Sequence, residues 1–335
     1  MTRRPDAKTM PALTRCSERR PLRPLLFLML LASLPAMARD WVVAADGSGD
    51  YRTLQQALDA VPDGNRERQV IRLRAGFYPG VVTVAKGKDQ VSVIGAGAGA
   101  SVISWNNYAD RIDPATGKAL RTSGSATMYV YGDGFIAEDL TIENTAGNVG
   151  QALALYAAAP HAGFRNVRLL GNQDTLYTHL GSVLHFKDCY IEGTVDFIFG
   201  GATALFDDCT VVSKGPLGYV TAASTPEGQR FGYVFRRAIL RGEGSATTYL
   251  GRPWRPFART VFIDSDLGGH LFAAGWHDWD KPDAQATTYY GEFGSKGAGA
   301  APEERVSWSH HLSGDEAAQY TTTAILGDWR PFEGD

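Results

Sequence analysis

Two aspartates, Asp174 and Asp196, occupy matching places in the sequence. Each lies ten residues after a phenylalanine, Phe164 in the first case and Phe186 in the second. If the two segments run side by side as neighbouring strands, the aspartate backbones lie roughly 5 Å apart. Two carboxylates at that distance cannot both ionise easily, so one pKa rises and the pair offers an acid and a base. On spacing alone, two unrelated surface aspartates explain the pattern equally well.

Two glutamines, an arginine and a tryptophan could complete such a site. Gln151 lies 22 residues before Gln173, and both side-chain amides could donate hydrogen bonds to a developing oxyanion. The planar guanidinium of Arg252 could hold one carboxylate in its ionised form. Trp254 offers a flat apolar face to a sugar ring. Each residue alone has an ordinary structural explanation, such as a solvated glutamine or a surface salt bridge, so only the combination indicates catalysis.

The elements that must position these residues follow an imperfect repeat. Each copy is an aromatic residue, followed three places later by a small or apolar residue and then by a short β-prone stretch. The copies begin at Phe164, Phe186, Phe206, Phe235 and Phe262, with spacings of 22, 20, 29 and 27 residues. Units of this length with short strands are typical of a parallel β-helix, in which each unit forms one coil. A β-sandwich, the alternative, shows turn signals about every 8–12 residues.

The two ends of the repeat region have different patterns. Apolar residues follow helical spacing from Leu54 to Val61, and Pro62 ends the run. This spacing predicts a short amphipathic helix that caps the N-terminal end of the coil stack, because terminal repeats need a cap. The segment after Ser313 is predicted to be a C-terminal tail that packs along the coils.

Cys189 and Cys209 occupy the same position in two successive repeats. Equivalent positions on adjacent coils lie about 4.8 Å apart, and a disulfide tolerates Cα separations of roughly 4.4–6.8 Å. The repeat therefore predicts a disulfide between them that closes a loop of about 20 residues and is worth about 3 kcal/mol. Two free, buried thiols are the alternative.

The first 38 residues are typical of a signal peptide. Three arginines precede the apolar run Leu25–Leu34, and Ala36-Met37-Ala38 follows as a small-x-small cleavage site. The run is shorter than the roughly 20 residues that span a bilayer, which disfavours a membrane anchor. We therefore expect a cleaved signal peptide over residues 1–38, a single domain over residues 39–335, and a secreted protein, either extracellular or periplasmic.

The charge of the mature chain excludes one class of partner. Without residues 1–38 the chain has 26 basic and 34 acidic residues, a net charge of −8. Nucleic-acid binding requires a basic surface, so we expect no nucleic-acid partner. An acidic protein also repels polyanions at long range, whereas a neutral or partly esterified polymer is less affected.

Four segments occur in the order typical of one enzyme family. They are Gln151-Ala-Leu-Ala-Leu155, Gln173-Asp-Thr-Leu176, Asp196-Phe-Ile-Phe-Gly200 and Leu250-Gly-Arg-Pro-Trp254. On these segments the mature chain resembles the pectin methylesterase (pectinesterase) family, in its bacterial secreted type. Gly275-Trp276-His-Asp-Trp279 and Tyr290-Gly-Glu292 also resemble that family. A Gly-x-Tyr-x-Glu segment is only partly kept, since Gly80 stands where the family has glutamate, which puts local packing in doubt.

The resemblance implies an all-β fold, a right-handed parallel β-helix, and hydrolysis of the methyl esters of polygalacturonate to pectate and methanol. It implies that Asp196 is the nucleophile and that Asp174 protonates the departing methanol and then activates water. Gln151 and Gln173 would stabilise the oxyanion, and Arg252 would orient Asp196 and keep it ionised. Residues implied to line the substrate groove are Tyr177, Phe199, Trp254, Trp276, Val195 and Thr122. Phe197 alternates with Phe199 along a strand, so we expect Phe197 in the core.

The resemblance also implies methyl-esterified homogalacturonan as the binding partner and a monomer that has no cofactor, no metal and no membrane span. A serine esterase is disfavoured because the sequence has no Gly-x-Ser-x-Gly. A zinc hydrolase is disfavoured because it has no His-Glu-x-x-His. Three alternatives stay open: a lyase or glycosidase acting on the same polymer, an esterase for another substrate such as an acyl thioester, and a non-catalytic carbohydrate-binding protein.

Overall fold

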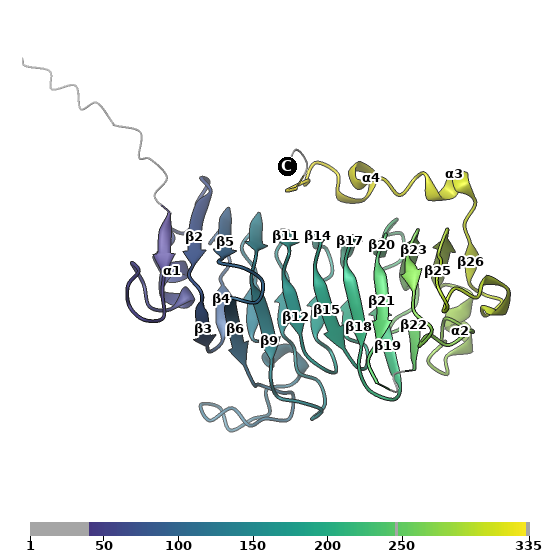
Figure 1. Ribbon diagram of the computed structural model, residues 1–335, viewed down its shortest axis with the longest axis horizontal. Coiled ribbons are helices and arrows are strands. Elements are labelled where there is room, and N and C mark those ends of the chain that lie inside the picture. The colour runs from purple at the N-terminus through teal and green to yellow at the C-terminus, as the bar shows by residue number, and fades with distance from the viewer. Residues whose placement is uncertain (1–39, 245–246, 333–335) are drawn as a thin grey trace, which may run out of the picture. The chain divides into compact units, whose positions relative to one another are not determined.

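The computed structural model describes residues 40–244 and 247–332, so the predicted signal peptide lies outside the described residues. The chain winds through three parallel β-sheets as a right-handed parallel β-helix, which confirms the predicted fold class (Figure 1). Each full coil contributes one strand to sheet A, then one to sheet B and one to sheet C. In the part of the chain that the structure describes, no helix has the length and apolar character needed to cross a membrane.

Strands of successive coils lie side by side in each sheet. In spatial order, sheet A contains β1 (Trp41–Val43), β2 (Gln69–Leu73), β5 (Val91–Gly95), β8 (Phe135–Glu138), β11 (His161–Arg165), β14 (Val183–Lys187), β17 (Thr203–Asp207), β20 (Tyr233–Arg236), β23 (Arg259–Ile263), β25 (Tyr289–Phe293) and β26 (His310–His311). Sheet B contains β24 (Asp266–Leu267), β21 (Ile239–Gly242), β18 (Thr210–Ser213), β15 (Tyr190–Gly193), β12 (Arg168–Leu170), β9 (Thr141–Asn144), β6 (Ser101–Trp105) and β3 (Gly76–Pro79). Sheet C contains β22 (Thr248–Pro253), β19 (Gly218–Ala223), β16 (Ile198–Gly200), β13 (Leu176–Thr178), β10 (Leu155–Ala157), β7 (Met128–Val130) and β4 (Val82–Val84).

The repeated phenylalanines form a ladder inside the coils. They occupy one register position of sheet A, and their rings stack at centroid distances of 4.8, 4.8, 4.4 and 4.5 Å along the series. All are fully buried, so each adds apolar area to a continuous core. The ladder consists of Phe164, Phe186, Phe206, Phe235 and Phe262. The repeat seen in the sequence is therefore the core of the fold.

The residue two places after each phenylalanine makes the sharp turn from sheet A to sheet B. Asn166, Asp188 and Asp208 have φ angles of 51°, 54° and 56°, in the left-handed region that asparagine and aspartate tolerate best. The backbone N–H of each donates to a carbonyl oxygen of the next coil; that of Asn166 reaches Lys187 at 3.0 Å. The Phe-x-Asp/Asn pattern thus encodes both an inward side chain and the turn that follows it.

The predicted capping helix is present as α1 (Leu54–Ala60). Thr53 accepts a hydrogen bond from the backbone N–H of Gln56, whose side chain bonds back to Thr53, and this capping box fixes the start of the helix. Leu54, Ala57 and Leu58 are buried. The helix packs against β4 and β1 at the first coils.

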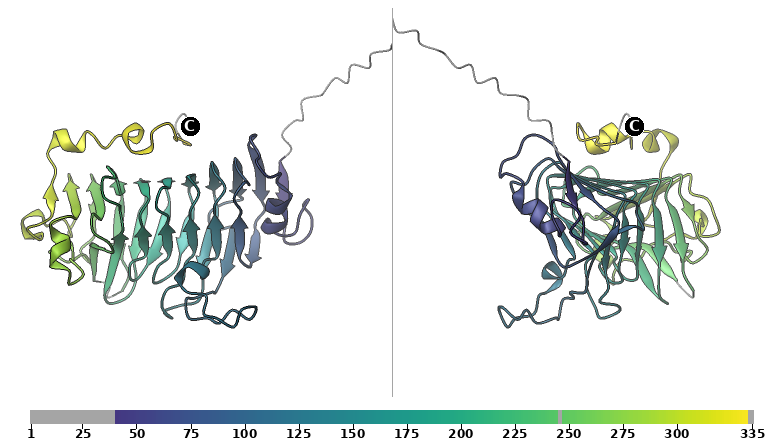
Figure 2. Two further views of the ribbon diagram at one scale, coloured as in Figure 1. Left: turned by 180° about the vertical axis from the view of Figure 1, so that it is seen from behind. Right: turned by 60° about the vertical axis from the view of Figure 1, so that its left-hand side comes forward.

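The predicted C-terminal tail covers the outer face of sheet A (Figures 1 and 2). After β26 it forms α3 (Gly314–Ala317) and α4 (Thr322–Leu326), and α4 packs on β17 and β14. Two glycines make room for it: a Cβ at Gly163 would lie 2.9 Å from Phe332, and one at Gly291 would lie 2.5 Å from Leu312. The remaining short helices are α2 (Pro282–Gln285), η1 (Thr122–Gly124) and η2 (Pro302–Glu304).

The predicted disulfide is wrong, because Cys189 and Cys209 are free, buried thiols. The Cys189 thiol donates to the carbonyl oxygen of Phe164 at 3.3 Å, and the Cys209 thiol donates to that of Phe186 at 3.4 Å. Aligned side chains in a parallel ladder stand side by side at about the strand spacing of 4.8 Å. A disulfide instead needs Cβ atoms about 3.5–4.5 Å apart. The two cysteines are aligned as predicted, but alignment alone does not form the bond, and both remain free thiols.

Candidate active site

One row of side chains runs along the outer face of sheet C. Tyr156, Tyr177, Phe199, Ala222 and Arg252 share a register position from β10 to β22. Because side chains alternate across a strand, all of them point out of the coil, while their neighbours point into the core. The Tyr156 and Tyr177 rings lie 4.6 Å apart, and the Tyr177 and Phe199 rings 5.1 Å apart. Sheet C thus presents an aromatic track that ends at a cation.

Asp174 and Asp196 lie in the short connections that lead from sheet B into β13 and β16. Each stands two residues before a strand residue that pairs with its counterpart, Leu176 with Ile198. They therefore hold equivalent places on adjacent coils, as the spacing predicts, about 4.8 Å apart at the backbone. Their φ angles are 65° and 51°, so both adopt the left-handed conformation. Both are 7% exposed.

Arg252 binds Asp196 through two hydrogen bonds. Its Nε donates to Oδ1 at 2.8 Å, and a terminal nitrogen donates to Oδ2 at 2.7 Å. The two residues stand two coils apart. On the coil between them, Ala222 occupies the register position of Arg252. A small residue there leaves the guanidinium free to cross the intervening strand. The guanidinium carbon also lies 3.7 Å from the ring centroids of Tyr219 and Trp279.

The two aspartates differ in their electrostatic surroundings. Burial raises the pKa of Asp174 to about 8, and the charge of Asp196 adds to that rise. Burial also raises the pKa of Asp196, but the hydrogen bonds and positive charge of Arg252 oppose that shift. Asp196 is therefore the member of the pair that is held ionised, while Asp174 keeps a proton near neutral pH. This arrangement supplies one nucleophilic carboxylate and one proton donor.

The pair lies in a pocket of about 490 Å³. The structure brings most of the predicted site residues to it: Asp174, Asp196, Arg252, Gln151, Gln173, Tyr177, Phe199, Trp254 and Thr122. Thr122 comes from the longest connection between sheets B and C, residues 106–127, which also supplies Arg121 and Ser123. Val195 lines an adjoining hollow of about 240 Å³, and Gln173 lines both hollows. The groove therefore continues beyond the aspartates.

Trp276 does not line the groove, contrary to the prediction. Its side chain is 1% exposed and stacks on Tyr290 in the core at 4.3 Å. Its backbone pairs with Gly251, a residue on the inward face of β22, and the ring fills the space that the missing Cβ of this glycine leaves. Trp279, three residues later, takes the place in the pocket. Phe197 lies in the core, as expected.

Sequence reasoning missed two aromatic residues of the pocket, Tyr156 and Trp279. A signal for Tyr156 was present, because it precedes Tyr177 by about one repeat and shares its outward register. No such signal exists for Trp279, which lies in a loop after the last full coil. Sequence reasoning also missed Tyr219, whose ring packs on Arg252. Tyr219 pairs with Tyr249 on the next strand of sheet C, so the repeat contained a signal for it.

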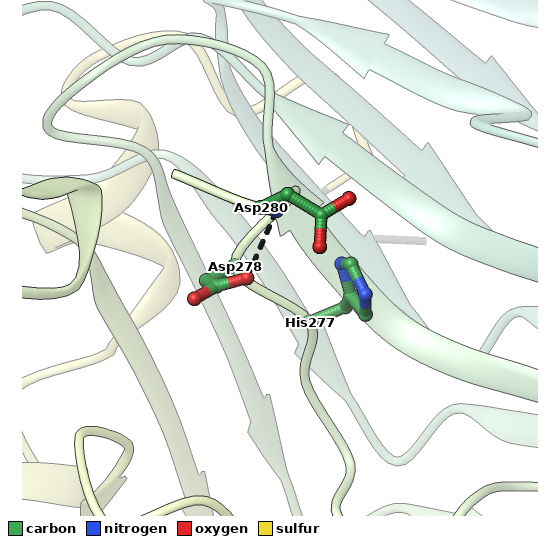
Figure 3. A group of neighbouring side chains, drawn as sticks. All are labelled: His277, Asp278 and Asp280. Carbon is green, nitrogen blue, oxygen red and sulfur yellow. Dashed lines mark hydrogen bonds between the residues drawn. The ribbon is translucent and has the colours of Figure 1, made fainter. Parts of the chain in front are cut away.

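Three side chains behind the pocket have atoms that could hold a metal ion. The ligand atoms of His277, Asp278 and Asp280 all lie within 4.8 Å of one another (Figure 3). Hydrogen bonds within the chain already engage part of this set. His277 Nδ1 accepts from the backbone N–H of Trp279 at 2.9 Å, and Asp278 accepts from the N–H of Asp280 and from Gln285. These bonds shape the loop itself.

Comparison with known proteins agrees with this geometry. Residues 40–328 match the family model described as Pectinesterase. The chain belongs to the pectinesterase family. This pectinesterase is 42% identical to Pectinesterase 31 of Arabidopsis thaliana over 83% of this chain and 89% of that protein. It superimposes on the pectin methylesterase from carrot with a TM-score of 0.81, at 35% identity, over 87% of this chain and 94% of that chain.

A second structural relative is described with a ligand. It is a pectin methylesterase in complex with a hexasaccharide, with a TM-score of 0.77 and 30% identity, and the match covers 88% of this chain and 99% of that chain. Pectinesterase 31 is a plant protein, while the sequence resemblance pointed to bacterial secreted enzymes. Membership of the family is thus established, and the bacterial type is not.

Proposed function

We propose that this pectinesterase removes methyl esters from polygalacturonate with Asp196 as nucleophile and Asp174 as acid and base. The chain is an enzyme, a carboxylic ester hydrolase that converts pectin to pectate and methanol. The roles of its residues follow from the asymmetry of the aspartate pair. Asp196 is held by two hydrogen bonds from Arg252, whereas burial keeps a proton on Asp174.

In the first half of the reaction, an oxygen of Asp196 attacks the carbonyl carbon of the methyl ester. The electron pair of the carbonyl moves onto its oxygen, and the side-chain amides of Gln151 and Gln173 donate hydrogen bonds to this oxyanion. When the carbonyl reforms, the bond to the methoxy oxygen breaks and Asp174 transfers its proton to that oxygen. Methanol leaves, and a galacturonyl anhydride with Asp196 remains.

In the second half, the ionised Asp174 takes a proton from water as the water oxygen attacks the anhydride carbonyl. The bond between this carbon and the Asp196 oxygen breaks, which returns Asp196 as a carboxylate and releases the galacturonate. Asp174 regains its proton in this step, and the resulting acid gives up its own proton to solvent. One water molecule is consumed for each methanol released.

The aromatic track supports an extended carbohydrate as the substrate. Tyr177, Phe199 and Trp254 line a groove that continues past Val195. Sugar rings pack well on aromatic side chains, whereas an acyl thioester would need an enclosed apolar channel. A partly esterified chain also suits an enzyme of net charge −8 better than pectate does, because each ester removes one negative charge.

We also propose that residues 1–38 are a signal peptide and that residues 39–335 form a single domain. The arginines, apolar run and small-x-small site at the N-terminus support export. Location outside the cytoplasm, in the manner of secreted bacterial pectinesterases, and action as a monomer are part of the same proposal.

The test is methanol release from highly methylated pectin by the chain that begins at Arg39, compared with Asp196→Asn. We expect release by the wild type and a loss of about 10³-fold or more in the variant, with no fall in viscosity. Falling viscosity would indicate a lyase or glycosidase. Equal release by the variant would assign the nucleophile to another residue, provided that both proteins unfold at the same temperature.

A further inference from the structure

His277 lies behind the pocket and does not line it. It stands in the loop between β24 and α2, and its side chain is only partly buried. Its contacts lead to both aromatic rings that enclose the guanidinium of Arg252. The proposed reaction gives His277 no role, although this residue contacts both Tyr219 and Trp279.

The first contact fixes Trp279. The backbone N–H of Trp279 donates to His277 Nδ1 at 2.9 Å, so Nδ1 is the unprotonated nitrogen of the ring. This bond from residue i+2 to the side chain of residue i has the form of an Asx-turn. Trp279 has a φ of 60°, a conformation that is unfavourable for a bulky side chain and needs support from its surroundings. The bond supplies part of that support.

The second set of contacts fixes Tyr219. The His277 ring meets Tyr219 edge-on at 5.7 Å and Tyr249 at 5.2 Å, and these two tyrosines stack on each other at 5.4 Å. The backbone N–H of His277 donates to the carbonyl oxygen of Gly251 at 3.1 Å. Gly251 directly precedes Arg252. One residue therefore anchors the loop to β22 and touches Tyr219 while it holds Trp279.

The consequence for the reaction passes through Arg252. The rings of Tyr219 and Trp279 both pack on its guanidinium, and each ring centroid lies 3.7 Å from the central carbon. Two rings in these places leave the edge of the guanidinium free, and that edge donates both hydrogen bonds to Asp196. If one ring moves away, the guanidinium gains rotational freedom and its bonds to Asp196 weaken.

We propose that His277 is a positioning residue: its Nδ1 holds Trp279 against Arg252, and Arg252 in turn holds Asp196 ionised and aimed. The proposal rests on the proposed function of Asp196. Asp278 and Asp280 are the charged groups beside His277 in the same loop (Figure 3), and Tyr219 and Tyr249 face it from β19 and β22. The acceptor at Nδ1 carries the argument.

Two variants separate the acceptor from the ring. His277→Asn keeps a side-chain oxygen that can accept the Trp279 N–H, whereas His277→Phe keeps an aromatic ring and has no acceptor. Loss of one hydrogen bond corresponds to roughly a 3- to 12-fold change. We expect kcat for methanol release to fall about 5- to 10-fold in His277→Phe and to stay within about twofold in His277→Asn.

The pH profile provides a readout that a merely structural role would not change. Arg252 lowers the pKa of Asp196, so weaker bonds from Arg252 raise it. The acidic limb of the kcat profile should therefore move to higher pH in His277→Phe and stay in place in His277→Asn. Trp279→Leu removes the ring without altering His277, and it should move the same limb even if the phenylalanine variant does not fold.

A matched control is His311→Phe, on the exposed strand β26, which should leave kcat and the pH profile unchanged. The proposal is overturned if folded His277→Phe retains the wild-type profile, or if His277→Asn is as impaired as His277→Phe. Failure of the proposed function would look different, because Asp196→Asn would then retain activity. The wild type and the five variants are assayed on the same pectin, with thermal unfolding as the check on folding.

Discussion

Two arginine–aspartate pairs on different sheets have nearly the same local geometry and opposite consequences. On sheet C, Arg252 binds Asp196, and the side chains are 15% and 10% exposed. On sheet A, Arg236 binds Asp207 through two nitrogens at 3.2 and 2.7 Å, and the side chains are 15% and 8% exposed. Neither distance nor burial distinguishes the catalytic candidate from the structural pair.

The difference lies in what covers each pair. The C-terminal tail closes over Arg236, which donates to the hydroxyl of Thr322 at 2.8 Å and to the carbonyl oxygen of Tyr320 at 3.4 Å. Arg237 adds a further bond to Asp207. Asp196 instead faces an open pocket that it shares with a second carboxylate. A buried ion pair is thus available for chemistry when its remaining side faces a pocket that can bind substrate, and not another part of the protein.

The largest effect should come from replacing Arg252 or Arg236 singly with glutamine. In Arg252→Gln, Asp196 loses two charge-assisted hydrogen bonds, so we expect kcat to fall about 10²- to 10³-fold and the acidic limb to move to higher pH. Arg236→Gln should leave kcat within about twofold and lower the free energy of unfolding by roughly 2–3 kcal/mol. Methanol release and urea unfolding measure the two effects. Equal losses of activity in both variants would remove the distinction between the sheets.

The next effect concerns the cover of sheet A. Phe332 is 6% exposed and packs on Gly163, and the centroid of its ring lies 5.2 Å from that of His185. Phe332→Ala should lower the free energy of unfolding by about 3 kcal/mol, with kcat at 25 °C unchanged. Phe77→Ala, at a residue that is 56% exposed, is the matched control and should change stability by less than about 0.5 kcal/mol. A large loss of activity in Phe332→Ala would show that the tail supports the groove.

A smaller effect comes from the buried histidine under the tail. Burial lowers the pKa of His185 to about 4, and neither ring nitrogen has a hydrogen-bond partner among the residues that the structure describes. The unfolded chain therefore binds a proton on this histidine below about pH 6.5, whereas the folded chain binds it only below about pH 4. The free energy of unfolding therefore decreases as pH falls from about 6.5 to about 4. The expected loss between pH 7 and pH 5 is about 2 kcal/mol.

His185→Leu should abolish this share of the pH dependence, while His311→Leu, on an exposed strand, should not. Urea unfolding at the two pH values measures the difference. An unchanged slope in His185→Leu would mean that the tail opens and lets the ring ionise in the folded state.

The last effect, only twofold at pH 8 itself, is expected on the alkaline side of the activity profile. Asp174 must carry a proton to assist methanol departure, and burial raises its pKa to about 8. We therefore expect kcat to fall as pH rises through about 8, to half its maximum at that value and by about tenfold for each further unit. A profile that stays flat to pH 10 would exclude Asp174 as the proton donor in the first half of the reaction.

Most of the fold follows from local rules that can be read in the sequence. The Phe-x-Asp/Asn pattern marks the residue that points into the core and the residue that makes the following turn. The stack of coils and the equivalence of Asp174 and Asp196 were therefore predictable. The helix at Leu54–Ala60 has both the spacing and the capping residues of an amphipathic helix. These predictions needed no information on contacts between distant segments.

The misses share a physical cause, because they depend on where side-chain atoms lie and not on which residues are aligned. Cys189 and Cys209 are aligned, yet they are two free thiols. Trp276 and Trp279 lie in one loop after the last full coil, where no repeat fixes which side faces inward. The backbone bridge of Trp276 to Gly251 decides the matter, and a glycine in a strand does not reveal which ring fills its space.

The unequal lengths of the connections between sheets B and C have a consequence for how such an enzyme can change over evolutionary time. The aspartates of the proposed catalytic pair occupy short connections, held by strands on both sides, whereas residues 106–127 form a long one that reaches the pocket through Arg121 and Thr122. Residues 114–118 of this long connection are exposed, whereas its end at Ser125–Thr127 is buried. Selection for a new pectin therefore acts most freely on the exposed part, where changes in length disturb the packed coils least.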